Sequence, residues 1–276
     1  MKASITKNKI LSITFATSSI LLLLLFWIIL TNIYNNSLIF PSIGQIFTSM
    51  KEILSSISSL KAIGMTILRS IIAVAICLVI CLLITSLYVA YPLSVNFFKP
   101  LIRIMRSVPL AILSIFIFIL IGSKKGPYVI TILMTLPVVF EGLILGVNEI
   151  PEGITDELKM LNVKTSQKII DIYIPMMNPY IIMSIVQALG MSFKVLIMGE
   201  YICQTKNSIG KELYNIKIDL DMASLLAYGI LIVIIVFVLE IVVNYLKWFT
   251  FWVFFCIIEP YNIKSSKKVE QNDIFK

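Results

Sequence analysis

The sequence predicts an all-α protein that crosses a membrane about six times. Three observations lead to this fold class: the chain has 276 residues, 59% of them are hydrophobic, and only 14% are charged. Its mean hydropathy is +0.98, whereas roughly a quarter of the residues in a soluble domain are charged. At about 20 residues per span, the length allows about five to seven spans and leaves no room for a large soluble catalytic domain.

Apolar stretches of membrane-spanning length recur along the chain, and each predicts one helix. The first follows a basic amino terminus, but it is longer than the hydrophobic part of a secretory signal and no A-x-A site follows, which predicts a retained span. We therefore expect a cytoplasmic segment at 1–9, a membrane domain over 10–257 and a polar cytoplasmic tail at 258–276. The expected spans are 10–33, 66–90, 100–121, 127–148, 177–199 and 223–257.

Lysine and arginine residues predict the orientation in the membrane, because they collect on the cytoplasmic side. With the amino terminus inside, the four cytoplasmic segments hold three, three, three and five of them, fourteen in total, against seven in the outer segments. Both termini are therefore expected in the cytoplasm. The net charge of +8 is then explained by membrane topology, and we expect no nucleic-acid partner.

Residue types that carry much enzyme chemistry are scarce. The chain has no histidine and four cysteines, which argues against zinc, haem and non-haem iron sites. Cys77 and Cys81 are four residues apart on one helix face and are expected in the core. No phosphate-binding loop is present, because Glu212 follows Gly210-Lys211 where serine or threonine is required. We expect neither enzymatic activity nor a cofactor bound by this chain.

The outer segment after the first span has the three-and-four spacing of an amphipathic helix. Ser42, with Gln45 three residues later, has the pattern of a capping box, in which each side chain bonds the other residue's backbone N–H. The helix is expected to lie along the interface or to pack on the spans. Its apolar positions are Ile43, Ile46, Phe47, Met50, Ile53, Leu54, Ile57 and Leu60.

The cytoplasmic segment 149–176 has the pattern of two short helices joined by a turn. Acidic residues near its start stabilise the positive end of a helix, and Asn162 stands where that helix would end, since asparagine tolerates the left-handed conformation. Thr165 is expected to cap a second helix that finishes before Pro175. The first helix carries an apolar stripe of Ile154, Leu158 and Leu161.

This segment resembles the EAA motif of the membrane subunits of binding-protein-dependent ABC importers. The matching positions are Glu157-Leu158-Lys159 for the motif, Asn162 for its following glycine, and Ile174-Pro175 for the later Ile/Leu-Pro. Here Leu158 and Lys159 replace the alanines. Flanking segments are similar to the taurine, sulfonate and nitrate branch of these permeases, over about 38–246. They are Leu38 to Ser42, Arg106-Ser107-Val108-Pro109-Leu110-Ala111, Leu136 to Gly146, and Gly190 to Glu200 with the later Ile209-Gly210, where Ser208-Ile209-Gly210 stands for the family's Gly-Ile-Gly.

The resemblance implies a type I ABC importer fold and a permease subunit in the bacterial cytoplasmic membrane. Its partners would be a cytosolic ATPase, which binds ATP and Mg²⁺, an extracytoplasmic solute-binding protein and a second permease copy. The solute would be a small organic or anionic compound, such as a sulfonate, taurine, nitrate or a pyrimidine. Segment 149–176 would dock on the ATPase as a coupling helix. The residues implied are Glu157, Leu158, Lys159, Leu161, Asn162, Ile174 and Pro175.

Helical spacing places Gln187, Met191, Lys194 and Met198 along one face of the fifth span. We expect this face to line the translocation path. Two roles for Lys194 stay open, since its ammonium group could attract an anionic solute or extend to the interface.

Other polar residues in the spans need partners, because a charge at membrane depth is unfavourable. Glu141 and Glu240 are expected to need basic partners such as Arg103 or Arg106, and which pairs form stays open. Glu200 could pair with a basic group in the outer loop, contact a binding protein or lie in solvent, and Arg69 is read as an interfacial anchor. Gly142 and Gly146 form a small-xxx-small face for close helix packing.

Three other function classes are alternatives. A secondary transporter usually shows two similar halves with interrupted helices, and no internal repeat is found. The scaffold of a vitamin-uptake system also uses cytoplasmic coupling helices but carries Ala-Arg-Gly signatures, which are absent here. A membrane enzyme would need histidine or clustered acids at membrane depth.

Overall fold

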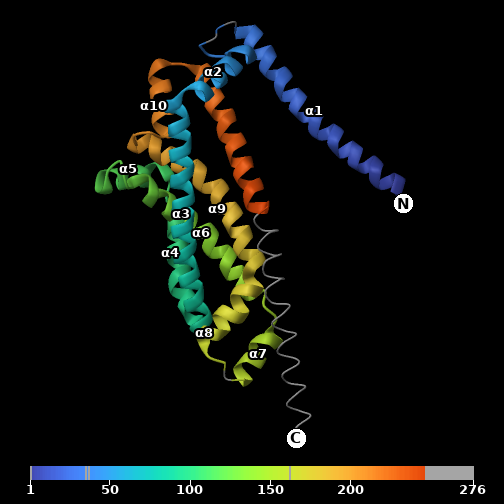
Figure 1. Ribbon diagram of the computed structural model, residues 1–276, viewed down its shortest axis with the longest axis vertical. Helices are drawn as coiled ribbons and strands as arrows, with labels where there is room; N and C mark the ends of the chain where they lie inside the picture. The colour runs from blue at the N-terminus through green and yellow to red at the C-terminus, as the bar shows by residue number, and fades with distance from the viewer. Residues whose placement is uncertain (1, 35, 37, 162, 246–276) are drawn as a thin grey trace.

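In the computed structural model, the described residues, 2–34, 36, 38–161 and 163–245, contain helices and no strand (Figure 1). The all-α fold class is confirmed. The elements are α1 (Lys2–Tyr34), α2 (Ile43–Ser55), α3 (Ile57–Ala90), η1 (Pro92–Ser94), α4 (Val95–Ser107), α5 (Leu110–Ile121), α6 (Gly126–Asn148), α7 (Glu152–Met160), α8 (Thr165–Gln167), η2 (Lys168–Tyr173), α9 (Ile174–Cys203) and α10 (Ile209–Asp219), followed by the helix Met222–Tyr245.

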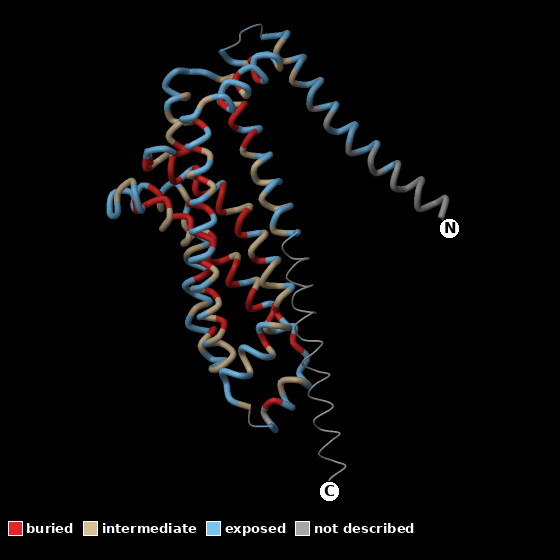
Figure 2. Tube along the Cα trace, in the orientation of Figure 1, coloured by how far each residue is buried: buried red, intermediate tan, exposed pale blue. Residues whose placement is uncertain are grey.

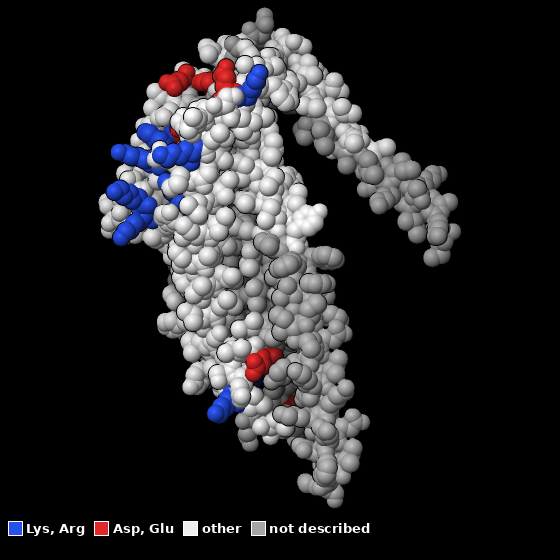
Figure 3. Space-filling model, viewed as in Figure 1, with Lys and Arg blue, Asp and Glu red and all other residues white. Residues whose placement is uncertain are grey.

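The helices form an elongated bundle with two distinct ends. Helices α2 and α10 lie at one end, and α7 and α8 lie at the other (Figure 1). Following the predicted topology, we call these the outer end and the inner end. Figure 3 shows charged side chains gathered toward both ends of the visible face, with uncharged surface between them. Such an uncharged band is what contact with lipid hydrocarbon requires.

Five described helices are long and apolar enough to cross a membrane, and a bent pair makes up to six. The five are Thr17–Tyr34, Ile57–Ala90, Gly126–Asn148, Thr165–Cys203 and Met222–Tyr245. The predicted span at 100–121 is not a continuous helix, because α4 and α5 meet at 100° and form a broken pair. Pro109 explains the bend, since it has no N–H to continue a helix and it holds Val108 in an extended conformation.

The predicted capping box at the start of α2 is confirmed. The Ser42 N–H donates to Gln45 Oε1 at 2.8 Å, and the Gln45 N–H donates to Ser42 Oγ at 3.3 Å. The amphipathic helix is shorter than predicted, because Ser56 is extended at φ −85° and ψ 121° and ends α2. Ile57 and Leu60 therefore belong to α3, which begins before the predicted boundary at residue 66.

Helix α9 is the centre of the packing, and buried residues follow it together with α3 and α6 (Figure 2). A Cβ added at Gly146 would lie 2.8 Å from Tyr180 Cβ, and one at Gly142 would collide with Ser184. The predicted small-residue face of α6 therefore packs directly on α9. Between α3 and α9, the hydroxyl groups of Ser70 and Ser192 lie 2.8 Å apart, a polar link of the kind that joins membrane helices. Cys77 and Cys81 are buried as predicted.

One helical run of 39 residues, Thr165–Cys203, connects the inner end to the outer end. The predicted break before Pro175 is wrong, and Thr165 is the first residue of α8 rather than a side-chain cap. The reason is the π-helical turn η2, in which the Ile174 N–H bonds to Ile169 O, five residues back. This wider turn accommodates the missing N–H of Pro175 and relieves the contact of its ring with the preceding turn.

Helix α1 diverges from the bundle (Figure 1), and its membrane-spanning part is 0% buried. It is joined to the outer end through Trp27, whose Nε1–H donates to Pro41 O at 3.2 Å and whose ring meets Phe40 edge-on. At the other end of the chain, the last span is described up to Tyr245. The rest of the predicted span to 257 and the tail 258–276 lie outside the described residues.

Candidate functional site

The first part of the predicted coupling segment forms α7, which starts at Glu152 as the acidic residues predict. Leu158 was predicted to contact a partner, but it is only 7% exposed and packs in the core cluster with Ile150 and Tyr173. This residue therefore holds α7 on the bundle and is not available for docking. The exposed apolar surface is formed instead by Met160, the last residue of α7, and by Leu161, which follows it. These residues are 82% and 72% exposed.

The remaining residues of the coupling motif fall into three groups. Glu157 is exposed on α7. Ile174 is also exposed, whereas Pro175 is half-buried within the helical run that continues into α9. Asn162 lies outside the described residues, as does the side chain of Lys159.

The predicted path-lining face of α9 is largely open in the single chain. Gln187, Lys194 and Met198 are exposed. Met191 departs from this pattern, because it is half-buried and packs against a cluster that includes Ile117 and Ile130. The open face therefore has three of the four predicted residues.

Gln187 also lines a groove of about 350 Å³ at the surface of α4, α6 and α9. Arg106, in the last turn of α4, crosses this groove and donates from Nη2 to Glu141 Oε2 of α6 at 2.6 Å. Arg106 was one of two predicted partners for Glu141 and Glu240, and in the structure it pairs with Glu141. Both side chains stay about half exposed.

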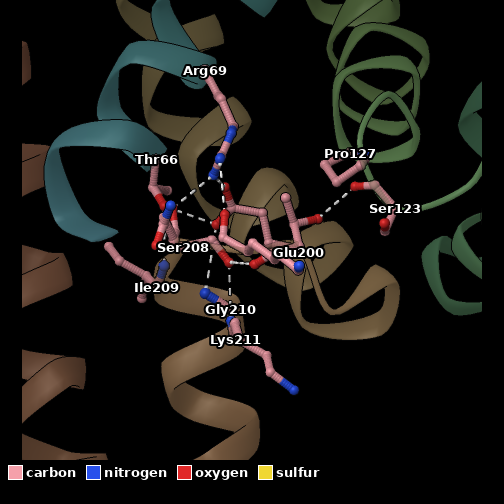
Figure 4. A network of polar contacts seen from close by, with 12 residues as sticks. Thr66, Arg69, Ser123, Pro127, Glu200, Ser208, Ile209, Gly210 and Lys211 are labelled. Atoms are coloured by element: carbon pink, nitrogen blue, oxygen red, sulfur yellow. Dashed lines mark hydrogen bonds and ion pairs between the residues drawn. The ribbon is translucent and has the colours of Figure 1, made fainter. Parts of the chain in front are cut away.

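At the outer end, Glu200 is the centre of a buried polar network (Figure 4). Its side chain is fully buried, and Oε1 accepts from Arg69 Nη1 of α3 at 2.7 Å. Its other oxygen, Oε2, accepts from Thr66 Oγ1 at 2.8 Å. The expectation that Glu200 lies in solvent or pairs with the outer loop is wrong. The prediction that Arg69 is an interfacial anchor is also wrong, because its side chain is buried and pairs with Glu200.

The same network fixes the loop between α9 and α10. Arg69 donates to the backbone oxygens of Lys206 and Asn207 at 3.1 and 3.2 Å. The Ile209 N–H donates to Thr66 Oγ1 at 3.1 Å. Gly210 packs so closely on α9 that an added Cβ would lie 2.5 Å from Glu200 Cβ. The start of α10 is therefore attached to α3 and α9 by specific contacts.

A cavity of about 490 Å³ lies at the outer part of α9, under α10 and the start of the last helix. Two predicted residues of α9, Lys194 and Met198, line it together with Tyr201, Lys217 and Asp221. Apolar side chains complete the lining: Ile197, Leu213, Ile216, Leu220, Met222 and Leu225.

Thr66 in the network and Lys217 in the cavity were not predicted, and Gly210 was named as part of the Ser208-Ile209-Gly210 segment that resembles the family and not as a network residue. A signal for the ion pair was present, because Arg69 and Glu200 are opposite charges at the outer parts of two spans, and such charges pair inside membranes. The described residues contain no group of three or more acidic or cysteine side chains placed to hold a metal ion. Hydrogen bonding, ion pairing and apolar contact are the interactions that these surfaces offer a ligand.

Comparison with known proteins adds two findings. The family model described as binding-protein-dependent transport system inner membrane component matches residues 92–247, which run from η1 into the last span. The glycine betaine/proline betaine transport system permease protein ProW of Escherichia coli (strain K12) is 24% identical over 194 residues, which cover 68% of this chain and 54% of ProW. The chain thus matches about half the length of this curated relative.

Proposed function

Because this chain belongs to the family of binding-protein-dependent transport system inner membrane components, we propose that it is the membrane-spanning permease subunit of an ABC importer. This is a family of transporter components and not of enzymes. In the proposed assembly, two copies of the chain form the translocation path, a cytosolic ATPase supplies energy by binding ATP with Mg²⁺, and an extracytoplasmic binding protein delivers the solute. The membrane domain would have both termini in the cytoplasm.

The surface of α7 at the inner end is the observation that carries the coupling proposal. Met160 and Leu161 are large apolar side chains that face outward beside the exposed acid Glu157. Leu158, which is buried, anchors the helix to the bundle. A short helix with an apolar patch and a charged rim suits docking into a groove of a partner protein. ATPase closure would then move α7 together with the helical run that starts at Thr165.

The exposed face of α9 is proposed to line the path. It carries Gln187, Lys194 and Met198, and it passes from the groove at Arg106 and Glu141 to the outer cavity. A hydrated path in a membrane needs such polar groups among apolar ones, because solute and water must both be accommodated. Met191 is proposed to contribute packing rather than solute contact.

The solute is proposed to be a small organic or anionic compound, of the sulfonate, taurine, nitrate or pyrimidine kind. The name of ProW gives betaines as the solutes of that protein, so a zwitterion with a quaternary ammonium group is a further candidate. Cavity size supports a small compound in either case, since about 490 Å³ lies within the range of small-molecule sites.

An affinity purification of the tagged chain in mild detergent tests the proposal. Mass spectrometry of the co-purifying proteins should find an ATPase with a phosphate-binding loop in a constant ratio to the permease. A chain that purifies alone and transports solute with an ion gradient would contradict the importer assignment and favour a secondary transporter.

The docking surface is tested by one substitution and a matched control. Leu161→Asp should abolish ATPase recovery, because it places a charge in the apolar patch. Leu93→Asp changes a similarly exposed leucine of η1, outside segment 149–176, and should leave recovery unchanged. Equal recovery with both variants would remove the docking role from α7 while leaving the family assignment intact.

A further inference from the structure

The outer cavity combines an apolar wall with two lysine side chains. Lys194 enters it from α9 and Lys217 from the last turn of α10. Neither lysine forms an ion pair with an acid in the described part of the chain, where the ion pairs are Arg69–Glu200 and Arg106–Glu141. Both lysine side chains are exposed, and an ammonium group beside an apolar surface attracts an anion more strongly than in bulk water, because the effective dielectric constant there is lower.

Asp221 is the acidic residue in the cavity lining, and it already has a structural task. Its Oδ1 accepts a hydrogen bond from the Ser224 N–H at 3.0 Å. It therefore caps the helix that begins at Met222, and the helix amino terminus stabilises its negative charge. The cavity keeps a net positive charge, since two lysines face one carboxylate.

The aromatic rings beside the cavity are already in contact with ammonium groups. Lys217 Nζ lies 5.9 Å from the centre of the Tyr201 ring, and Lys211 Nζ lies 4.8 Å from that of Tyr214. These two rings also meet each other edge-on, with centroids 5.8 Å apart. A quaternary ammonium ligand needs free aromatic faces. At this site it would have to displace a lysine of the same charge.

More basic side chains lie toward the outer end of the bundle. Figure 3 shows a group of them on the visible face. The loop before α6 contributes Lys124 and Lys125, and the loop before α10 contributes Lys206, all exposed. Such a group raises the local concentration of anions and their rate of arrival. Its place at the outer end runs against the usual distribution of lysines, which favours the cytoplasmic side.

We propose that the cavity lined by Lys194, Lys217 and Tyr201 is a binding site for a small organic anion with an apolar body, and that it rejects quaternary ammonium cations. The apolar residues of α10 and the last helix hold the body of the ligand, and the two ammonium groups bind its sulfonate, carboxylate or comparable group. This inference rests on the proposed transport function, because it makes the cavity the outer entry to the path.

Binding is measured on the full-length chain in nanodiscs of zwitterionic lipid by equilibrium dialysis, with empty nanodiscs as the blank. The two probes are radiolabelled benzenesulfonate and phenyltrimethylammonium, which share an aromatic body and differ in the sign of their charge. We expect saturable binding of benzenesulfonate and at least about tenfold weaker binding of phenyltrimethylammonium.

Variants assign the binding to the cavity. Lys194→Met and Lys217→Met should each weaken benzenesulfonate binding about tenfold, because each removes a charged partner of the anion. Lys194→Arg keeps the charge and should retain binding. Lys51→Met, at an exposed position of α2 that does not line the cavity, serves as the matched control and should have no effect.

Equal binding of the two probes, or equal affinity in Lys194→Met and Lys51→Met, would overturn the proposal. The ATPase co-purification separates this result from a failure of the proposed function. Recovery of the ATPase without lysine-dependent binding removes only the anion site. Lysine-dependent binding in a chain that recovers no ATPase keeps the anion site and removes the importer assignment.

Discussion

Two ion pairs of the same chemistry have opposite environments in this molecule. Arg69–Glu200 and Arg106–Glu141 each join two helices, with N–O distances of 2.7 and 2.6 Å. The first pair is 8% and 0% exposed, whereas the second is 58% and 50% exposed. The two ion pairs therefore differ in their burial and not in their N–O distance.

Burial changes what each pair contributes to stability. A buried guanidinium that loses its carboxylate partner remains charged in an apolar interior, which is strongly unfavourable. A half-exposed pair can exchange its partner for water, so its net contribution is small. The outer pair is therefore suited to hold the loop between α9 and α10, and the pair in the groove is suited to open when α4 and α6 move.

Glu200→Ala is the strongest test of this difference. It leaves the Arg69 guanidinium buried without its carboxylate, and should lower the free energy of unfolding by about 3–5 kcal/mol. Thermal unfolding of the purified protein in detergent, followed by size-exclusion chromatography, measures the loss. Glu141→Ala is the matched control and should change the unfolding temperature far less. Equal shifts in the two variants would contradict the distinction by burial.

The double variant Arg69→Met with Glu200→Leu sharpens the same test. It removes both charges, so it should recover part of the stability lost in Glu200→Ala. Recovery should be incomplete, because Thr66 and the loop carbonyl groups still lose their hydrogen bonds to the pair. A double variant less stable than Glu200→Ala would show that an unpaired charge is not the source of the loss.

Gly210→Ala tests the packing around the buried pair with a smaller expected effect. The new methyl group would lie 2.5 Å from Glu200 Cβ, so the loop must shift, and we expect a loss of about 1–3 kcal/mol. Gly229→Ala in the last helix is the control, because nothing lies within 4 Å of its added Cβ. That control should be neutral or slightly stabilising, since alanine favours helix. Thermal unfolding compares the two, and equal stability would contradict the close packing.

The smallest effect is expected for the pair in the groove. A double-mutant cycle of Arg106→Met and Glu141→Gln should give a coupling energy of about 0–1 kcal/mol. The coupling should weaken further as the salt concentration rises, because exposed charges are screened. Thermal unfolding at low and high salt measures it. A coupling as large as that of Arg69 and Glu200 would mean that the groove is closed to water in the assembled protein.

The sequence predicted the fold class well, because long apolar runs and a capping motif are local signals. The capping pair Ser42 and Gln45 and the glycines at 142 and 146 lie where their spacing predicts. The bend at Pro109 and the continuous helix through Pro175 were missed for one physical reason. A proline can end a helix or remain in one, and the choice depends on neighbouring turns, here the π-helical turn before Ile174.

The sites were harder to predict than the fold, because they depend on contacts between distant residues. Arg69 and Glu200 are 131 positions apart, and no local pattern joins them. The burial of Leu158 could not be predicted either. Helical spacing shows which residues share a face, but not which part of the molecule that face packs against. Lys217 lines the cavity with Lys194 only because α10 folds back over α9.

The isolation of α1 has a consequence for how the chain is made. A helix satisfies its own backbone hydrogen bonds, so it is stable in lipid without neighbours. Since none of the described residues in the spanning part of α1 is fully buried and its contact with the outer end is made at Trp27, this helix can enter the bilayer as soon as it leaves the ribosome. The later helices, whose polar groups at Arg69 and Glu200 need each other, assemble only after both of their spans are synthesised.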